Sequence, residues 1–196
     1  MTAAPSRRRE ILRAAERLFE HYGASKTTIA DVAREAGVGV GTVYLEFACK
    51  EAIVEELSRA KHEVVLHAMR AAAGRGDLPF HARVAAVFDG RLEAYFRLAR
   101  GGQHACDLVQ HRSPMGVEAR RRFLAEEHAL VVDLVRLGVL ARELVSDDPA
   151  STASALLACY ATFAPPLVLA AREREARRGL AAVHAIVLEG IRTRRS

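Results

Sequence analysis

Residues 27–50 read TTIADVAREAGVGVGTVYLEFACK, and this stretch decides the fold. Its apolar residues recur at spacings of three and four, which is the periodicity of an amphipathic α-helix. Thr28 stands before the first apolar run and Asp31 follows three residues later, a pattern typical of a capping box. Gly37 suits the left-handed conformation that ends many helices. The stretch therefore predicts one helix between Thr28 and Gly37 and a shorter one over 41–47.

The same periodicity continues along the chain, and no segment alternates with the period of a strand. The fold class expected is all-α, with about nine helices. The first three form an N-terminal helix-turn-helix domain. The expected helices span about 7–22, 29–36, 41–47, 50–73, 80–100, 103–111, 116–137, a segment starting at Pro149 with a kink at Pro165-Pro166, and 175–193.

Composition sets the broad class of the chain. With 196 residues and 51% apolar residues, it can bury a core without covalent cross-links, which excludes a mainly disordered chain. Cys49, Cys106 and Cys159 are odd in number and widely spaced, which argues against a disulfide scaffold and against a zinc module. The first ten residues contain no apolar signal-peptide core, so a cytoplasmic location is expected.

Charge and hydropathy bear on possible partners. The formal net charge is +5, and 26 arginines outnumber 3 lysines. Arginine suits phosphates and carboxylates, so this balance permits nucleic-acid binding without requiring it. Residues 149–171 contain no charged side chain, but Ser151, Thr152 and the Pro165-Pro166 pair favour a buried interface helix over a membrane span.

The two short helices and the Gly37–Gly39 turn have the geometry of a helix-turn-helix, whose second helix enters the major groove of DNA. Val38 and Val43 are expected to face the core. The outward face of the second helix is expected to carry Val40, Gly41, Thr42, Leu45 and Glu46.

At these residues the chain resembles the tetracycline-repressor (TetR) family of bacterial regulators. The resemblance is carried by Gly23, Thr28, Asp31, Val32, Ala33, Ala36-Gly37-Val38, Gly41-Thr42-Val43-Tyr44, Phe47 and Lys50-Glu51-Ala52. It implies a DNA-binding domain over 1–49 and a helical ligand-binding and dimerisation domain over 50–196. It also implies a homodimer joined through the last two helices, a double-stranded DNA operator of pseudo-palindromic sequence, a small-molecule ligand that releases the DNA, and repression of transcription.

The resemblance also implies roles for particular residues. Thr42 and Tyr44 would contact phosphates, and Lys50 would share a phosphate with the N-terminus of its own helix. Thr28 would present another helix N-terminus to the DNA backbone. Arg7, Arg8 and Arg9 could follow the backbone as a basic arm. The predicted DNA-binding set is Thr28, Val40, Gly41, Thr42, Tyr44, Leu45 and Lys50. Gly39, Glu46 and Ala48-Cys49 depart from the family pattern, which affects the expected operator sequence.

A ligand pocket is expected in the C-terminal part, although an aromatic stripe of this kind is more often plain core. The candidate residues are Phe88, Tyr95, Phe96, His104, Asp107, Phe123, His128, Tyr160 and Phe163. Two alternatives remain open. One is a metal or redox sensor on the same scaffold, using His104, Asp107, His111 or Cys49. The other is an all-α enzyme or interaction module. No enzyme signature is present, so we expect no catalysis, no cofactor and no bound metal.

Overall fold

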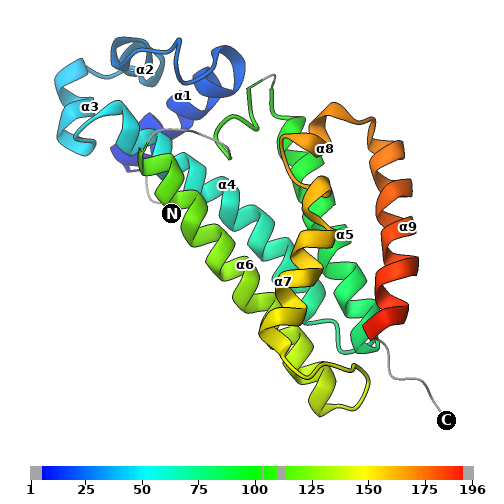
Figure 1. Cartoon of the computed structure of the whole chain (residues 1–196). Coiled ribbons are helices and arrows are strands. Elements are labelled where there is room, and N and C mark those ends of the chain that lie inside the picture. Colours follow the sequence, from blue (N-terminus) through cyan, green and yellow to red (C-terminus); the bar gives the residue numbers. More distant parts are fainter. Residues whose placement is uncertain (1–5, 103, 110–113, 192–196) are drawn as a thin grey trace. The chain divides into compact units, whose positions relative to one another are not determined.

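The computed structural model describes residues 6–102, 104–109 and 114–191, and within them the chain is all-α, as predicted (Figure 1). The described elements are α1 (Arg7–Tyr22), α2 (Ile29–Ala36), α3 (Val40–Glu46), α4 (Lys50–Ala73), α5 (Phe80–Ala99), α6 (Pro114–Leu140), α7 (Pro149–Cys159), a 3-10 turn (Ala161–Phe163), α8 (Leu167–Ala170) and α9 (Glu173–Ile191). No helix in these described ranges is long and apolar enough to cross a bilayer.

The chain divides into two compact units. The first unit comprises Met1–His62 and Leu98–Arg121, and the second comprises Glu63–Arg97 and Arg122–Ser196. The compact units therefore do not follow one cut in the sequence, since α4, α5 and α6 each contribute to both. The domain boundary between residues 49 and 50 stays a prediction.

The core of the first unit gathers the apolar stripes of its short helices around the start of α4. Its fully buried members include Ile11, Phe19, Val32, Val43 and Ile53. At one edge of this unit Lys61 of α4 donates to the carboxylates of Glu16 and Glu20 on α1. Helices α1 to α3 are thus held by a continuous apolar core and by polar contacts at its edge.

The helix expected over 103–111 is wrong for its described part, because residues 104–109 form turns. The backbone N–H of His104 donates to the carbonyl of Glu20 at 2.9 Å, and Leu108 is buried in the core of the first unit. A Cβ on Gly102 would lie 2.5 Å from that same carbonyl, so only glycine allows this approach. Contacts with α1 override the local helical pattern here. Gln103 and His111 lie outside the described residues.

The segment after Pro149 begins as predicted and then differs. Asp148 caps α7, since its carboxylate accepts from the N–H of Ala150 at 3.0 Å. The helix ends at Cys159, and a 3-10 turn and the short α8 follow instead of one kinked helix. Ala164 is extended, with φ −117° and ψ 154°, because the ring of Pro165 disfavours a helical residue before it. The prolines therefore break the helix instead of bending it.

Buried polar contacts join the helices of the second unit. The guanidinium of Arg91 on α5 donates to Glu127 on α6 at 2.8 Å and to the carbonyl of Tyr160 at 2.5 Å. The hydroxyl of Tyr160 lies 2.8 Å from Nδ1 of His184 on α9. Helices α5, α6 and α9 and the residue that follows α7 thus meet around two side chains, Arg91 and Tyr160.

Candidate nucleic-acid interface

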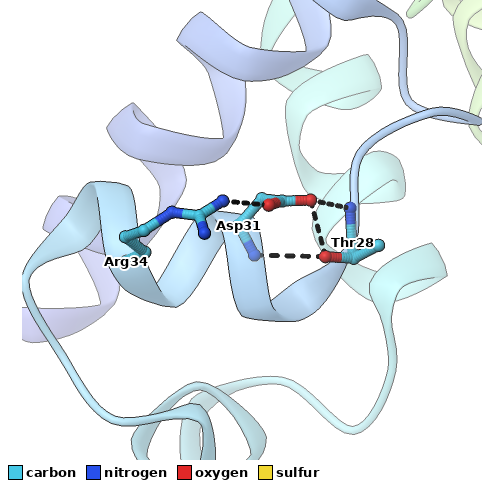
Figure 2. A network of polar contacts seen from close by, with 3 residues as sticks. All are labelled: Thr28, Asp31 and Arg34. Atoms are coloured by element: carbon cyan, nitrogen blue, oxygen red, sulfur yellow. Dashed lines mark hydrogen bonds and ion pairs between the residues drawn. The ribbon is translucent and has the colours of Figure 1, made fainter.

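A complete capping box begins helix α2 (Figure 2). The hydroxyl of Thr28 accepts from the N–H of Asp31 at 3.2 Å, and the N–H of Thr28 donates to the Asp31 carboxylate at 3.0 Å. The Thr28 hydroxyl also donates to that carboxylate at 2.6 Å, and Arg34 pairs with it. These hydrogen bonds from Thr28, together with the charge of Arg34, hold the pKa of Asp31 below its usual range.

The capping box changes what Thr28 offers to a partner. Its hydroxyl hydrogen is already donated to Asp31, so the side chain is engaged within the chain. Any phosphate at this point would be received by the backbone N–H groups of Ile29 and Ala30 in the first turn, since the N–H of Asp31 already donates to Thr28.

The turn between α2 and α3 follows the predicted geometry. Gly37 is left-handed, with φ 67° and ψ 29°, and the N–H of Val38 returns to the carbonyl of Ala33 at 3.0 Å. The turn directs Val43 into the core with 0% exposure, and Val38 packs partly against it. Both valines therefore face inward, as the sequence predicted.

The opposite face of α3 exposes large side chains. Val40 is 42% exposed, Tyr44 54% and Leu45 85%, whereas residues of this size are usually buried. A Cβ on Gly41 would meet nothing within 4 Å, so the chain itself does not require glycine there. An apolar outer face with free space above Gly41 suits the close approach of another molecule.

Lys50 has an internal role that its sequence pattern does not indicate. Its Nζ donates to the carbonyl of Ala24 at 2.9 Å and to that of Thr27 at 3.2 Å. Lys50 thereby fixes the loop between α1 and α2. An ammonium group has three donors, so one remains for a phosphate.

The run of arginines at the start of α1 also divides into two kinds. Arg7 and Arg9 are exposed. The guanidinium of Arg8 lies 4.0 Å from the centre of the Phe47 ring and donates to the carbonyl of Glu46 and to the carboxylate of Glu56. The basic arm expected from the sequence is therefore reduced to Arg7 and Arg9.

The aromatic side chains predicted to line a ligand pocket are buried in the second unit. They are Phe88, Tyr95, Phe96, Phe123, Tyr160 and Phe163. The rings of Phe88 and Tyr160 stack with centres 3.8 Å apart, and Tyr160 is fully buried. This burial and stacking are also what a plain aromatic core would show.

The polar candidates for the pocket are divided between the two units. His104 and Asp107 belong to the first unit, where Nδ1 and the carboxylate are 2.7 Å apart. His128 belongs to the second unit, and its Nε2 lies 3.0 Å from the hydroxyl of Ser154.

The positions of His104 and Asp107 give little support to the alternative of a metal sensor. Among the described residues, no three metal-binding side chains are grouped together, and His111 is outside that range. Cys49, the cysteine of the redox alternative, is free and partly exposed, and a redox role for it stays a prediction. For Cys106, burial, assisted by the charge of Asp107, raises the pKa of the thiol to about 11 and so favours its protonated form at neutral pH.

A groove in the second unit was not predicted. It has a volume of about 420 Å³. Apolar side chains, including Leu130, Leu134 and Leu137 of α6, form much of its lining, with Arg70, Arg83, Glu126 and Asp133 among its charged residues. Its apolar α6 residues recur at helical spacing, so the sequence marks them as one face of a helix. The sequence pattern does not show that other parts of the chain leave this face uncovered.

Comparisons with known proteins agree with the geometry of the first unit. Residues 11–57 match the family described as "Bacterial regulatory proteins, tetR family". The HTH-type transcriptional regulator TtgR of Pseudomonas putida is 37% identical over 75 residues, which cover 38% of this chain and 36% of TtgR. The match thus spans about a third of that relative. The HTH-type transcriptional regulator YhgD of Bacillus subtilis is 27% identical over 161 residues, covering 79% of this chain and 80% of YhgD.

Solved structures extend the likeness of fold to the whole chain. The TetR family transcriptional regulator PfmR from Thermus thermophilus has a TM-score of 0.66 at 18% identity, covering 98% of this chain and all of PfmR. The ketosteroid transcriptional regulator KstR2 of Mycobacterium tuberculosis has a TM-score of 0.59 at 23% identity, covering 97% of each chain.

Residues 11–57 therefore place the N-terminal part of the chain in the tetR family of bacterial regulatory proteins. TtgR and YhgD are both named as transcriptional regulators, in agreement with the prediction that the chain is not an enzyme.

Proposed function

We propose that the chain represses transcription by binding a pseudo-palindromic operator as a homodimer, and that a small molecule releases it from the DNA. The observation that carries this proposal is the exposed outer face of α3, held on a helix-turn-helix that matches the tetR family. Val40, Tyr44 and Leu45 are exposed on the same short helix, and exposed apolar groups that lie together are typical of interaction sites.

The proposed DNA contacts divide into positioning and base reading. Tyr44 and Thr42 donate hydroxyl hydrogens to phosphates, and the remaining donor of Lys50 supplies a third contact. Val40 and Leu45 contact thymine methyl groups in the major groove, and Gly41 lets the duplex approach α3 closely. Thr28 contributes through the N–H groups of the turn that it caps.

The operator proposal is tested by selection from a randomised duplex library with the wild-type protein. We expect the selected sequence to be a pseudo-palindrome that binds with Kd below about 0.1 μM, at least roughly 1,000-fold more tightly than a scrambled duplex of equal length. Equal affinity for the two duplexes at physiological salt would contradict the proposal. The selected duplex then serves as the probe for every variant of the protein.

The homodimer is proposed to form through α7 and α9. The exposed residues of α7 are small and uncharged, including Ser151, Ser154, Ala155 and Ala158. On α9, Ile186 is 77% exposed. Small side chains permit close packing of helices from two subunits, and a two-fold dimer matches a palindrome with half-sites one helical turn or a multiple of it apart.

Charge placed on these faces tests the dimer. We expect Ala158→Glu and Ile186→Glu to be monomeric at 10 μM in sedimentation equilibrium and to lose operator binding. Ala71→Glu adds the same charge at an exposed position of α4 and should remain dimeric. Tight operator binding by a monomeric variant would exclude this assembly.

The small-molecule site is proposed to lie in the second unit, with the buried aromatic residues as its predicted lining. The volume of the groove also falls in the range of ligand sites, so the two locations need to be separated. The probe is the dye bis-ANS, titrated into wild type and Leu137→Arg, which places a charge in the groove. Unchanged dye affinity in that variant favours the aromatic site, whereas loss of binding assigns the dye to the groove.

A further inference from the structure

Arg8 makes three contacts, two of them at the carboxyl end of α3 and one on α4. Its Nη1 donates to the carbonyl of Glu46, the last residue of that helix, and its Nη2 donates to the Glu56 carboxylate on α4. Its guanidinium lies over the Phe47 ring, 4.0 Å from the ring centre. One side chain from α1 thus bridges the end of the predicted DNA-reading helix and α4.

The chemistry of these contacts suits arginine in particular. The last carbonyls of a helix lack internal partners and carry partial negative charge, so a cation there is favourable. A planar guanidinium can stack on an aromatic ring while its N–H groups donate in different directions, which an ammonium cannot do. An ion pair whose arginine is 42% exposed contributes little alone, so the carbonyl and ring contacts are the essential ones.

The position of Phe47 explains why these contacts reach the DNA-reading face. Phe47 is 3% exposed, and its N–H donates to the carbonyl of Val43 at 2.9 Å, closing the last turn of α3. Helix α3 has only seven residues and no side-chain cap at its start, so few local interactions stabilise it. Its orientation therefore depends strongly on how its carboxyl end is held.

We propose that Arg8 is a positioning residue, which holds α3 in the orientation needed for base reading while making no contact with DNA itself. Arg9, one residue along the same helix, is exposed and serves as the matched control. The expected change in DNA affinity rests on the proposed function. The effect of Arg8 on α3 is measurable in the free protein, without DNA.

The first test is amide hydrogen exchange by NMR on the free protein. We expect Arg8→Lys, which keeps the charge, to speed exchange at the Phe47 amide at least fivefold. Glu56→Gln, which leaves Arg8 in place and removes only the ion pair, should give a smaller increase. Arg9→Lys should change it less than twofold. Thermal melting of each variant verifies that the first unit is folded. Unchanged Phe47 exchange in Arg8→Lys would overturn the proposal even if the protein binds DNA.

The second test measures affinity for the selected duplex and for its scrambled counterpart across a salt series. We expect Arg8→Lys to bind the selected duplex about 5 to 20 times more weakly, with the scrambled affinity and the salt slope close to wild type. Arg9→Ala should weaken both duplexes alike. A loss for Arg8→Ala that is equal on both duplexes and reduces the salt slope by about one would identify a phosphate contact and overturn the proposal. Absence of duplex binding by the wild type would instead reject the proposed function and leave the exchange result to decide the role of Arg8.

Discussion

The two units differ in where they place their charged side chains. In the first unit the described ion pairs are at least partly exposed: the side chains of Arg8 and Glu56 are 42% and 25% exposed, and those of Lys61 and Glu20 are 11% and 16% exposed. In the second unit Arg91 and Glu127 are paired at 3% and 5% exposure. Both units expose large apolar side chains, such as Leu45 in the first and Ile186 in the second, but only the second encloses a charged pair at 5% exposure or less among the described residues.

This difference agrees with where sequence likeness is found. The family match covers 11–57, whereas PfmR and KstR2, which resemble the whole chain in fold, are only 18% and 23% identical to it. A surface with one chemical partner, here the proposed DNA duplex, is expected to keep a recognisable pattern of residues. An interior can be packed in many ways, so its residues need not follow one pattern.

The largest expected effect concerns the buried pair of the second unit. Arg91→Met leaves Glu127 as an uncompensated buried charge and should lower the free energy of unfolding by roughly 3–5 kcal/mol. Arg91→Met/Glu127→Met should recover most of that loss, because no buried charge remains. Urea unfolding of the single and double variants measures both. Equal losses in the two variants would show that packing around Arg91, and not its charge, is what matters.

The next effect concerns pH and His62 in the first unit. Burial lowers the pKa of His62 to about 4, partly opposed by its hydrogen bond with the Val109 carbonyl and assisted by the charge of Arg120. Between pH 6.5 and about 4 the unfolded chain therefore binds a proton at His62 that the folded chain does not. The contribution of neutral His62 to the free energy of unfolding is therefore fully present above pH 6.5. It is lost as the pH falls toward 4, and the loss is at most roughly 3 kcal/mol.

His62→Gln provides the control for that prediction. Glutamine can donate to the Val109 carbonyl but does not titrate. Its free energy of unfolding should vary less than that of the wild type between pH 7 and pH 5. Carboxylates with lowered pKa, such as Asp31 and Asp148, lose their contribution only at lower pH in both proteins. An identical pH dependence in the two proteins would show that His62 is not the titrating group.

A smaller effect is expected at the phosphate contacts of the first unit. Tyr44→Phe removes one hydroxyl at a side chain that is 54% exposed, so folding should be unaffected. Binding to the selected and scrambled duplexes should weaken equally, by roughly 1–2 kcal/mol. Competition titrations at one salt concentration compare the two duplexes. A loss confined to the selected duplex would assign Tyr44 to base reading instead.

The smallest effect concerns the thymine methyl groups. Replacing operator thymines by uracil should cost the wild type up to about 1 kcal/mol of binding free energy, because methyl contacts with Val40 and Leu45 are lost. The same replacement should cost much less in Val40→Ala/Leu45→Ala. Fluorescence anisotropy with matched thymine and uracil duplexes tests this. Equal costs in the two proteins would exclude these side chains as methyl contacts.

Local signals in the sequence determined much of the first unit. The Thr28 capping box, the Gly37 turn and the start of α4 at Lys50 were all predicted, since each depends on residues within about one turn of the helix. The burial of Val43 followed from periodicity alone. The DNA-binding and ligand-binding residues stay predictions.

Only the tertiary structure decided the rest. Arg8 bonds to residues 38 and 48 positions away, and Lys50 to carbonyls 23 and 26 positions away, so no local pattern could reveal either role. The turns at 104–109 replaced a predicted helix because Gly102 and His104 meet the carbonyl of Glu20, far earlier in the chain. Helical periodicity reports which face of a segment is apolar, whereas contacts between distant segments decide whether that segment stays helical and which polar groups remain available to a partner.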